Sequence, residues 1–375
     1  MTGISLITNN TNSWSAYTRQ CFYANGRYWA FYLDDGSSYW YFTSSSDNST
    51  WDTPTQAFGA SSTPRGYIFF DGTYVHYVYA WQSSSIKYRR GTPDSNGTIS
   101  WSAAEQAIST TGTWGDYPSV AVDSSGYAYV GYVRYDGANY YPYITKNANT
   151  DGTWSDASGY PKALYSTTSD STWLVRVLPQ TSGKMYAMYF RTGATRGAYC
   201  TDGSTWTDEA INTSLSANSR FSCSSDGDDI HFVWDYAAGP TYKLYYRKRS
   251  SGSWGSETEL LDKGGTGYNY YQSLCVDTSS HDAWAFVSNY PNSDSIYYRM
   301  YDYSADSWDA SWTEVSGLTG NSNSAITSYQ NAFSGAVVFF WRDGTDPYDL
   351  HQDVLVDPTS GETVNNVYIF YGKFS

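Results

Sequence analysis

Short runs of apolar and aromatic residues, separated by turns rich in Gly, Asp, Asn and Ser, recur along the whole chain. Within these runs apolar and polar residues alternate, which is typical of half-buried β-strands. The first unit predicts four strands, at 17–23, 27–33, 39–44 and from near Trp51 onward. No stretch keeps the periodicity of an amphipathic helix, so the pattern predicts an all-β protein.

This four-strand unit is repeated. A Ser/Thr-Trp pair closes a short polar turn six times, 48 to 58 residues apart. Self-similarity at such a period indicates one supersecondary unit copied many times, with each copy burying its apolar face against its neighbours. In the sixth copy Trp308 and Trp312 both fit the repeat position, and the sequence leaves the choice open. The pairs end at Trp51, Trp101, Trp154, Trp206, Trp254 and Trp312.

The seventh unit determines how the array closes. We name the strands of a unit A to D from the axis outward; in this unit strand B fits 335–341 and strand C fits 367–374, with no strand D after them. The run ISLITNN at 4–10 lies where a strand D would precede the first strand A, so it completes the last blade and removes an open sheet edge. We therefore predict a seven-bladed β-propeller of four-stranded antiparallel blades, with six or eight blades as the alternative counts.

The domain prediction follows from this closure. Residues 1–375 form a single propeller domain, in which residues 1–13 complete the last blade and 342–366 form a long B–C insert. The blade boundaries are predicted near residues 14, 62, 115, 170, 217, 267 and 321.

Charge and composition narrow the possible partners. The net charge is −14 and no cluster of Lys and Arg occurs, which argues against nucleic acid. No apolar run is long enough to span a membrane, and no charged segment followed by an apolar run marks a signal peptide. Four widely spaced cysteines, Cys21, Cys200, Cys223 and Cys275, form no CxxC motif and are predicted to be buried free thiols.

The turns before the tryptophans resemble the Asp-box (BNR) repeats of sialidase-like β-propellers. TDGSTW (201–206), NTDGTW (149–154) and SSDNSTW (45–51) are degenerate forms of Ser-x-Asp-x-Gly-x-Thr-Trp. The resemblance implies that each Asp caps its turn and each Trp packs between sheets. The superfamily includes sialidases, other glycosidases, polysaccharide lyases and non-enzymatic proteins.

The glutamates do not match the catalytic pattern of sialidases. Five of the six follow a repeat Trp by two to five residues, which places them on the outermost strand D, and Glu362 lies in the predicted insert. The Arg-Ile-Pro of sialidases has no counterpart, because Arg19 is followed by Gln20. A glycosidase with two carboxylates would have to use Asp alone. The sequence therefore predicts no catalytic residue and favours a protein that is not an enzyme.

The D–A and B–C connections of a propeller share one face, which we call the loop face, where ligands usually bind. In this chain these connections are rich in Arg and aromatic residues. Aromatic rings stack on sugar rings, while Arg, Asp and Asn hydrogen-bond to their hydroxyl groups. The predicted ligand-binding set is Asp34, Arg65, Trp81, Trp114, Arg134, Arg191, Arg220, Asp235, Tyr290 and Arg342.

The predicted insert is acidic and suggests a metal only weakly. Its aspartates offer hard oxygen ligands that suit calcium, but their spacing fits no EF-hand, so the default interpretation is a solvated acidic loop and no cofactor is predicted. These residues are Asp343, Asp346, Asp349, Asp353 and Asp357.

Three functions are compatible with these features. The main hypothesis is a non-catalytic extracellular or surface-displayed propeller that binds a glycan or another surface ligand through its loop face. One alternative is a sialidase-like glycoside hydrolase or a polysaccharide lyase that uses Tyr, His or Arg as acid and base. The other is a structural or attachment protein of a virion or cell envelope. A Tyr–His–Arg cluster on the loop face would favour the lyase.

Overall fold

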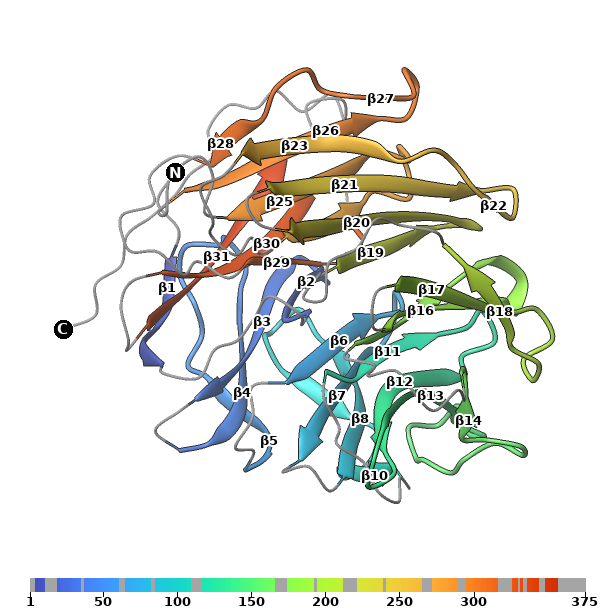
Figure 1. The fold of residues 1–375 in the computed structure, drawn as a ribbon. Helices are drawn as coiled ribbons and strands as arrows, with labels where there is room; N and C mark the ends of the chain where they lie inside the picture. The colour runs from blue at the N-terminus through green and yellow to red at the C-terminus, as the bar shows by residue number, and fades with distance from the viewer. Residues whose placement is uncertain are drawn as a thin grey trace.

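The computed structural model contains seven antiparallel sheets arranged around a common axis (Figure 1), which confirms the seven-bladed β-propeller. Helix is almost absent from the described chain, which contains one 3₁₀ turn at Thr181–Gly183. The structure describes residues 4–10, 19–34, 37–60, 65–81, 85–108, 117–165, 174–191, 194–211, 221–238, 241–264, 272–288, 295–315, 326–329, 331–332, 336–343 and 348–356. The predicted blade boundaries all lie outside these residues.

In blades 1 to 6 the first strand is innermost and the order outward follows the chain. Blade 1 contains β2 (Cys21–Ala24), β3 (Arg27–Asp34), β4 (Tyr39–Ser45) and β5 (Thr55–Ala60). Blade 2 contains β6 (Gly66–Phe70), β7 (Val75–Trp81), β8 (Ser85–Pro93) and, both paired with β8, β9 (Ile99–Trp101) and β10 (Gln106–Ile108). Blade 3 contains β11 (Ser119–Val122), β12 (Ala128–Tyr135), β13 (Tyr140–Lys146) and β14 (Lys162–Ala163).

The remaining blades follow the same plan. Blade 4 contains β15 (Val175–Pro179), β16 (Met185–Arg191), β17 (Ala194–Cys200) and β18 (Thr207–Ala210). Blade 5 contains β19 (Phe221–Asp226), β20 (Asp229–Ala238), β21 (Thr241–Ser250), β22 (Ser253–Trp254) and β23 (Thr258–Gly264). Blade 6 contains β24 (Gln272–Val276), β25 (Ala283–Ser288), β26 (Ile296–Asp302), β27 (Ser307–Trp308) and β28 (Thr313–Val315). Blade 7 contains β29 (Ile326–Ser328), β30 (Ala336–Asp343), β31 (Tyr348–Val356) and β1 (Ile4–Asn10).

The ring closes through the N-terminal strand, as the sequence predicted. Strand β1 pairs antiparallel with β31, with Ile4 opposite Gln352 and Asn10 opposite Tyr348. In Figure 1 the blue β1 and the red β31 therefore belong to one sheet, although they come from opposite ends of the chain. Without β1, the outer edge of β31 would present unpaired backbone groups.

The predicted B–C insert at 342–366 is wrong. Strand β30 ends at Asp343 and β31 begins at Tyr348, so the connection between them is short. The acidic residues of this segment suggested a loop, but β31 has a pairing partner on each side, β30 and β1, and the backbone pairing holds it as a strand. The run at 367–374, predicted as strand C, lies outside the described residues.

The turns that precede the tryptophans have the expected chemistry. The Oδ1 atom of Asp202 accepts backbone N–H groups from Ser204 and Thr205, at 2.8 and 2.6 Å, and Asp47 caps its own turn in the same way. Such bonds fix the turn and hold the pKa of Asp47 and Asp202 well below its usual range, despite an opposing effect of burial at Asp47. Whether these turns are Asp-box repeats in the family sense remains a prediction.

The strand register also settles which tryptophan belongs to the sixth repeat. Trp308 lies opposite Tyr301 in blade 6, as Trp254 lies opposite Arg249 in blade 5 and Trp101 opposite Gly91 in blade 2. Trp308 is therefore the repeat tryptophan.

Aromatic side chains fill the spaces between neighbouring sheets. Between blades 1 and 2, the rings of Phe58 and Tyr77 stack with their centroids 4.3 Å apart, and Trp40 meets Tyr77 edge-on. Tyrosines of strands B and C, such as Tyr79 and Tyr88, are fully buried in these interfaces. The high Tyr content therefore serves packing between blades first, as aromatic pairs favour.

The four cysteines are free and buried, as predicted. Burial raises the pKa of Cys21 and Cys223 to about 12, so their thiols stay protonated at neutral pH.

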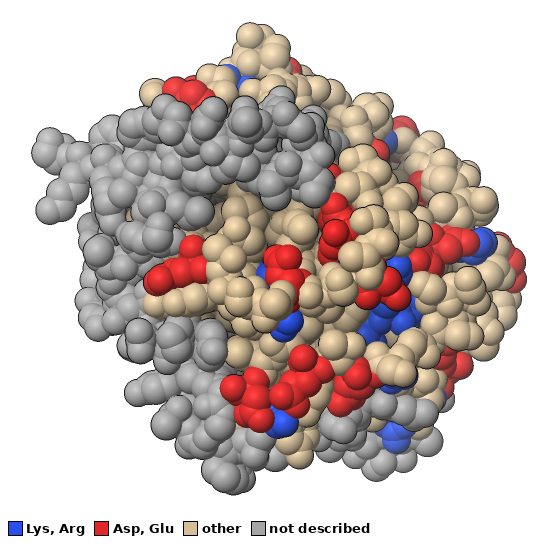
Figure 2. Space-filling view, turned by 90° about the horizontal axis from the view of Figure 1, so that it is seen from above, with Lys and Arg blue, Asp and Glu red and all other residues tan. Residues whose placement is uncertain are grey.

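Among the described residues no helix is both long and apolar enough to cross a bilayer. Figure 2 shows acidic side chains spread over one face with Lys and Arg among them, in keeping with the net charge of −14.

Two histidines, His76 and His231, occupy the same repeat position but have different surroundings. His76 contacts Tyr88 Oη through Nδ1 and Asp71 Oδ2 through Nε2, at 2.9 and 3.0 Å. The Nδ1 of His231 contacts Tyr246 Oη at 2.9 Å, but its Nε2 has no partner within the described part of the chain. Burial, with a smaller effect of nearby Lys248 and His281, lowers the pKa of His231 to about 3.

We expect His231 to make the propeller sensitive to acid. The unfolded chain binds a proton at His231 below about pH 6.5, whereas the folded chain does so only near pH 3. The contribution of His231 to the free energy of unfolding is therefore fully present above about pH 6.5. It is lost as the pH falls toward 3, by about 1.4 kcal/mol per pH unit for one such group. We measure the free energy of unfolding in urea at several pH values between 6 and 4. Plotted against pH, it should fall less steeply for His231→Asn than for the wild type. His76→Asn is the matched control, since Asp71 offsets part of the burial there; equal slopes for wild type and His231→Asn would contradict the assignment.

Candidate functional site: the axial mouth

The innermost strands are tied together by side-chain hydroxyl groups around the axis. Ser119 of β11 donates to the carbonyl of Val175 at 2.9 Å and accepts from the N–H of Val177 at 3.1 Å. Ser222 and Ser273 accept backbone N–H groups of the next blade in the same way, at 3.0 and 2.7 Å. Small polar residues at this position let adjacent inner strands lie close together without leaving buried donors unsatisfied.

Arg19 crosses this ring of serines. It lies two residues before β2 in blade 1 and is 4% exposed. Its guanidinium donates to atoms of blades 5, 6 and 7: Ser222 Oγ, Cys223 O, Ser273 Oγ, Ser328 O and Ser328 Oγ. All of these acceptors are neutral, so a whole positive charge is buried at the axis.

A second arginine, Arg176 of β15, lies near Arg19. Its Nη1 donates to the carbonyl oxygens of Tyr117 and Val175, each at 3.1 Å, and its guanidinium lies 5.0 Å from the centre of the Tyr67 ring. Burial and the proximity of Arg19 lower the pKa of Arg176 to about 10, which leaves it charged at neutral pH. Two like charges at one place raise the local positive potential of a strongly acidic protein.

Arg65 and Tyr117 lie at the loop-face end of the innermost strands, where β6 and β11 begin. The Arg65 guanidinium lies 4.9 Å from the centre of the Tyr117 ring. Tyr117 has a φ of 52°, a left-handed conformation that is rare for an aromatic residue. Such strain gathers at functional sites, and at this site Arg176 holds the Tyr117 carbonyl in place.

We call Arg65, Tyr67, Tyr117 and Arg176 the axial mouth. Arg65 and Tyr117 are half-buried and form its accessible layer, while Tyr67 and Arg176 lie below them at 1% and 4% exposure. The Tyr67 hydroxyl has no hydrogen-bond partner among the described residues. A buried hydroxyl of this kind calls for a water molecule or a ligand group.

For five of the predicted binding residues the structure describes the side chain as well as the backbone. Arg65 belongs to the axial mouth. Arg134 donates to Tyr143 Oη at 3.2 Å in blade 3, and Arg191 lies over the Tyr165 ring at 4.3 Å. Asp34 caps a turn by accepting from Ser37, and Asp235 is 5% exposed.

For the other five predicted residues the structure gives less. Trp81 and Arg342 lie at the loop-face ends of β7 and β30, with only their strand positions described. Trp114, Arg220 and Tyr290 lie outside the described residues. The predicted set as a whole therefore remains a prediction.

Sequence reasoning missed Arg176, Tyr67 and the role of Arg19. The signal was present in β15, VRVLP, where one charged residue interrupts a strand that is otherwise apolar and too short to reach solvent. The side chain of an arginine within an innermost strand can reach polar partners only at the axis.

The positions of the aspartates on β30 and β31 do not add support for a calcium site. Asp343 lies on β30 opposite Asp349 on β31, and Asp353 lies further along β31, opposite Phe339. Asp346 and Asp357 lie outside the described residues. Within the described ranges no group of three or more His, Cys, Asp or Glu residues could hold a metal ion. Calcium binding remains an untested expectation.

Comparison with known proteins yields structural likeness only. No family model matches the chain, and no curated protein matches its sequence. A PL25 ulvan lyase solved with a -[GlcA(1-4)Rha3S]- fragment is 10% identical, with a TM-score of 0.62 over 95% of each chain. The polysaccharide lyase Uly1 is 8% identical, with a TM-score of 0.54 over 90% of each chain.

A sialidase is also among the similar structures. The NanB sialidase of Streptococcus pneumoniae is 15% identical, with a TM-score of 0.49 over 95% of this chain and 70% of that one. At these identities the likeness shows the fold alone, a β-propeller shared with polysaccharide lyases. It identifies no particular protein.

Proposed function

We propose that this propeller is a polysaccharide lyase that binds an acidic polysaccharide at the axial mouth. The observation that carries the proposal is the Arg65–Tyr117 pair above Arg176, a cationic and phenolic cluster on the face where propeller ligands bind. The fold is one that polysaccharide lyases use. The match to the lyase solved with a glucuronate-containing fragment covers 95% of each chain. These findings support the lyase alternative over the non-catalytic hypothesis.

The chemistry of such a reaction matches what the mouth offers. In β-elimination a base removes the proton beside the uronate carboxyl group, the glycosidic C–O bond on the adjacent carbon breaks, and a C=C bond forms. The leaving oxygen takes a proton from an acid. A guanidinium paired with the carboxylate makes the proton easier to remove, and a tyrosine can serve as acid or base.

We assign these roles within the axial mouth. Arg65, in the accessible layer, binds the uronate carboxylate, since Arg forms two parallel hydrogen bonds with a carboxylate. Tyr117 carries the proton to or from the sugar. Arg176 and Tyr67 are positioning residues, which hold the Tyr117 backbone and the local positive potential. A polysaccharide substrate also accords with an extracellular or surface-displayed location, which we include in the proposal.

The test is cleavage of uronate-containing polysaccharides, ulvan among them, followed by the ultraviolet absorbance of the new double bond. We expect Tyr117→Phe and Arg65→Met to lower the rate by about 100-fold or more, as loss of an acid, base or charge stabiliser does. Tyr303→Phe, an exposed tyrosine far along the sequence in the C–D turn of blade 6, is the control and should keep full activity.

Two results would overturn the proposal. Absence of both cleavage and binding across the acidic polysaccharides would remove the ligand class. Binding that is lost in Arg65→Met but accompanied by no cleavage would return the protein to the non-catalytic carbohydrate-binding hypothesis.

A further inference from the structure

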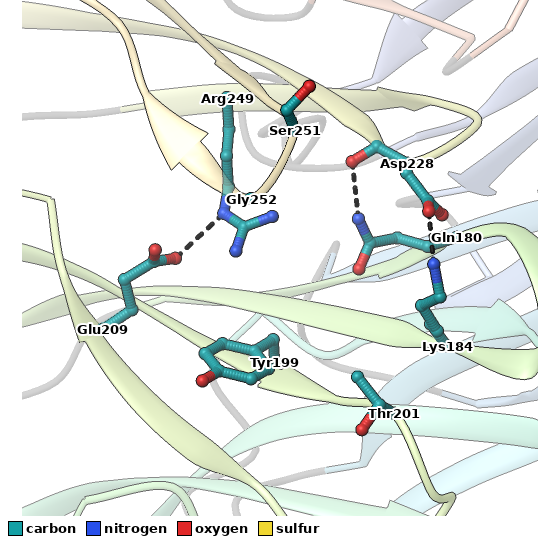
Figure 3. Close-up of a pocket in the computed structure, with 9 residues that line it drawn as sticks. All are labelled: Gln180, Lys184, Tyr199, Thr201, Glu209, Asp228, Arg249, Ser251 and Gly252. Atoms are coloured by element: carbon teal, nitrogen blue, oxygen red, sulfur yellow. Dashed lines mark hydrogen bonds and ion pairs between the residues drawn. The ribbon is translucent and has the colours of Figure 1, made fainter.

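A cavity lies between blades 4 and 5, on the face of the A–B and C–D turns, away from the axial mouth. Its volume is about 490 Å³, within the range of small-molecule sites. Figure 3 shows side chains from both blades that converge on it: Gln180, Lys184, Tyr199, Glu209, Asp228 and Arg249. The turn Ser251–Gly252 of blade 5 closes one side.

The cavity lies where strand C of blade 4 differs at one position from strand C of blades 2, 3 and 5. The register identifies the equivalent residues, each opposite the second residue pair of the A–B hairpin. They are Arg90 in blade 2, Lys146 in blade 3 and Lys248 in blade 5, all cations. In blade 4 the equivalent residue is Tyr199, opposite Tyr186.

In blades 2, 3 and 5 the cation reaches the C–D turn of the next blade and fills the junction. Blades 1 and 6 have Ser44 and Met300 at the equivalent position. Arg90 donates to the Thr150 carbonyl, and Lys248 lies over the Tyr303 ring at 4.6 Å. A Cβ built on Gly203 would lie 3.0 Å from Lys146 Nζ, so this turn is also in contact with its cation. A Cβ on Gly252, by contrast, would meet no described atom within 4 Å.

A second departure accompanies the first. The A–B turn position that is Asp71, Asp123 and Asp226 in blades 2, 3 and 5 is Gln180 in blade 4. In blade 3 the aspartate and the cation are partners, with Lys146 Nζ 3.9 Å from Asp123 Oδ2. Blade 4 thus replaces a charged pair by an amide and a phenol ring, and an open space results.

The charges around this space cancel. Arg249 Nε donates to Glu209 Oε2 at 3.0 Å, and Lys184 is paired with Asp228. Glu209 also accepts from the Tyr186 hydroxyl at 2.6 Å, and Gln180 Nε2 donates to the Asp228 carbonyl at 2.7 Å. These contacts hold donors and acceptors in fixed positions on two sides of the Tyr199 ring (Figure 3).

We propose that the cavity between blades 4 and 5 is a second binding site, for a neutral saccharide. An aromatic ring flanked by fixed charged pairs is suited to a sugar, whose C–H face packs on the ring while its hydroxyl groups bond to carboxylate and guanidinium. The zero net charge of the two pairs disfavours a uronate or sulfate. The site thus complements the axial mouth by holding an uncharged part of a polysaccharide, and it does not depend on cleavage there.

The test uses the repeat itself to close the cavity. The variant Gln180→Asp/Tyr199→Lys restores the residues of blade 3, where the junction is filled, so the protein is expected to fold. Glucose, galactose, mannose, rhamnose and fucose are titrated individually by calorimetry, with glucuronate as the anionic probe. We expect at least one neutral sugar to bind the wild type and its affinity to fall by about tenfold or more in the variant.

Control variants separate this site from the others. Asn96→Lys adds a lysine to the C–D turn of blade 2, where the Asn96 side chain is exposed, and should leave binding unchanged. Glu209→Gln should weaken binding, and thermal unfolding checks that it is folded. Tyr117→Phe should slow cleavage by about 100-fold or more but keep neutral-sugar binding. The proposal is overturned if no neutral sugar binds, if glucuronate alone binds, or if the double variant binds as the wild type does.

Discussion

Removal of residues 1–10 is expected to open the ring and cause a large loss of stability. Strand β1 pairs with β31 at positions that include Ile4, Ser5, Ile7 and Asn10. At about 1 kcal/mol for each hydrogen-bonded position, the backbone pairing alone contributes on the order of 4 kcal/mol. The truncated protein also exposes the edge of β31, which invites pairing with another copy.

Urea unfolding and light scattering after size-exclusion chromatography measure these two effects. We expect a lower unfolding midpoint and concentration-dependent self-association. A synthetic peptide of residues 1–13 should restore the monomer and the midpoint, and a scrambled peptide should not. A truncated protein with the wild-type midpoint and elution volume would show that β1 contributes nothing to closure.

Replacement of Arg19 by Ala is expected to cost about 3–5 kcal/mol of unfolding free energy. The substitution leaves a void at the axis and removes the donor shared by Ser222, Ser273 and Ser328. Each buried acceptor left without a partner costs about 1–3 kcal/mol, and partial rescue by water lowers the sum. The affected bonds join blade 1 to blades 5, 6 and 7, so the loss weakens the ring as a whole.

Denaturant unfolding monitored by tryptophan fluorescence measures this loss. Arg134→Ala is the matched control: its guanidinium contacts Tyr143 at the rim of blade 3, and its loss should cost about 1 kcal/mol or less. Arg19→Lys should lie between the two, because an ammonium group keeps the charge but cannot reach acceptors on three blades. Equal effects of Arg19→Ala and Arg134→Ala would refute a structural role for the axial arginine.

The ring and its closure could be predicted from the sequence because both rest on local patterns. Repeated strand–turn units give the blades, and an unpaired N-terminal run at one end matches a missing strand at the other. The seventh blade shows the limit of this reasoning. Its strand β31 carries Asp349 and Asp353 and reads as a loop, and only its pairing with two neighbours makes it a strand.

The candidate site was predicted only in part. Arg65 was found because it lies in a D–A connection, which the repeat assigns to the loop face. Arg176 and Tyr67 lie within inner strands that a periodicity analysis assigns to the core, and their meeting depends on which blades adjoin across the axis. The strain at Tyr117 has no sequence signature, since its left-handed backbone arises from the surroundings.

The cavity between blades 4 and 5 illustrates a signal that is present in the sequence but needs the register to be read. Arg90, Lys146, Tyr199 and Lys248 are equivalent only when the strands are aligned by their pairing. Tyr199 stands where blades 2, 3 and 5 carry a cation, so the aligned copies show where the junction between blades 4 and 5 differs from theirs.

The cysteines give the propeller a set of internal reporters. Cys21, Cys223 and Cys275 lie one to a blade on the innermost strands of blades 1, 5 and 6, all without a disulfide. An alkylating reagent can reach them only when the blades separate at the axis. The rate of labelling, resolved by mass spectrometry for each peptide, would therefore show which interface between blades separates first, without any engineered probe.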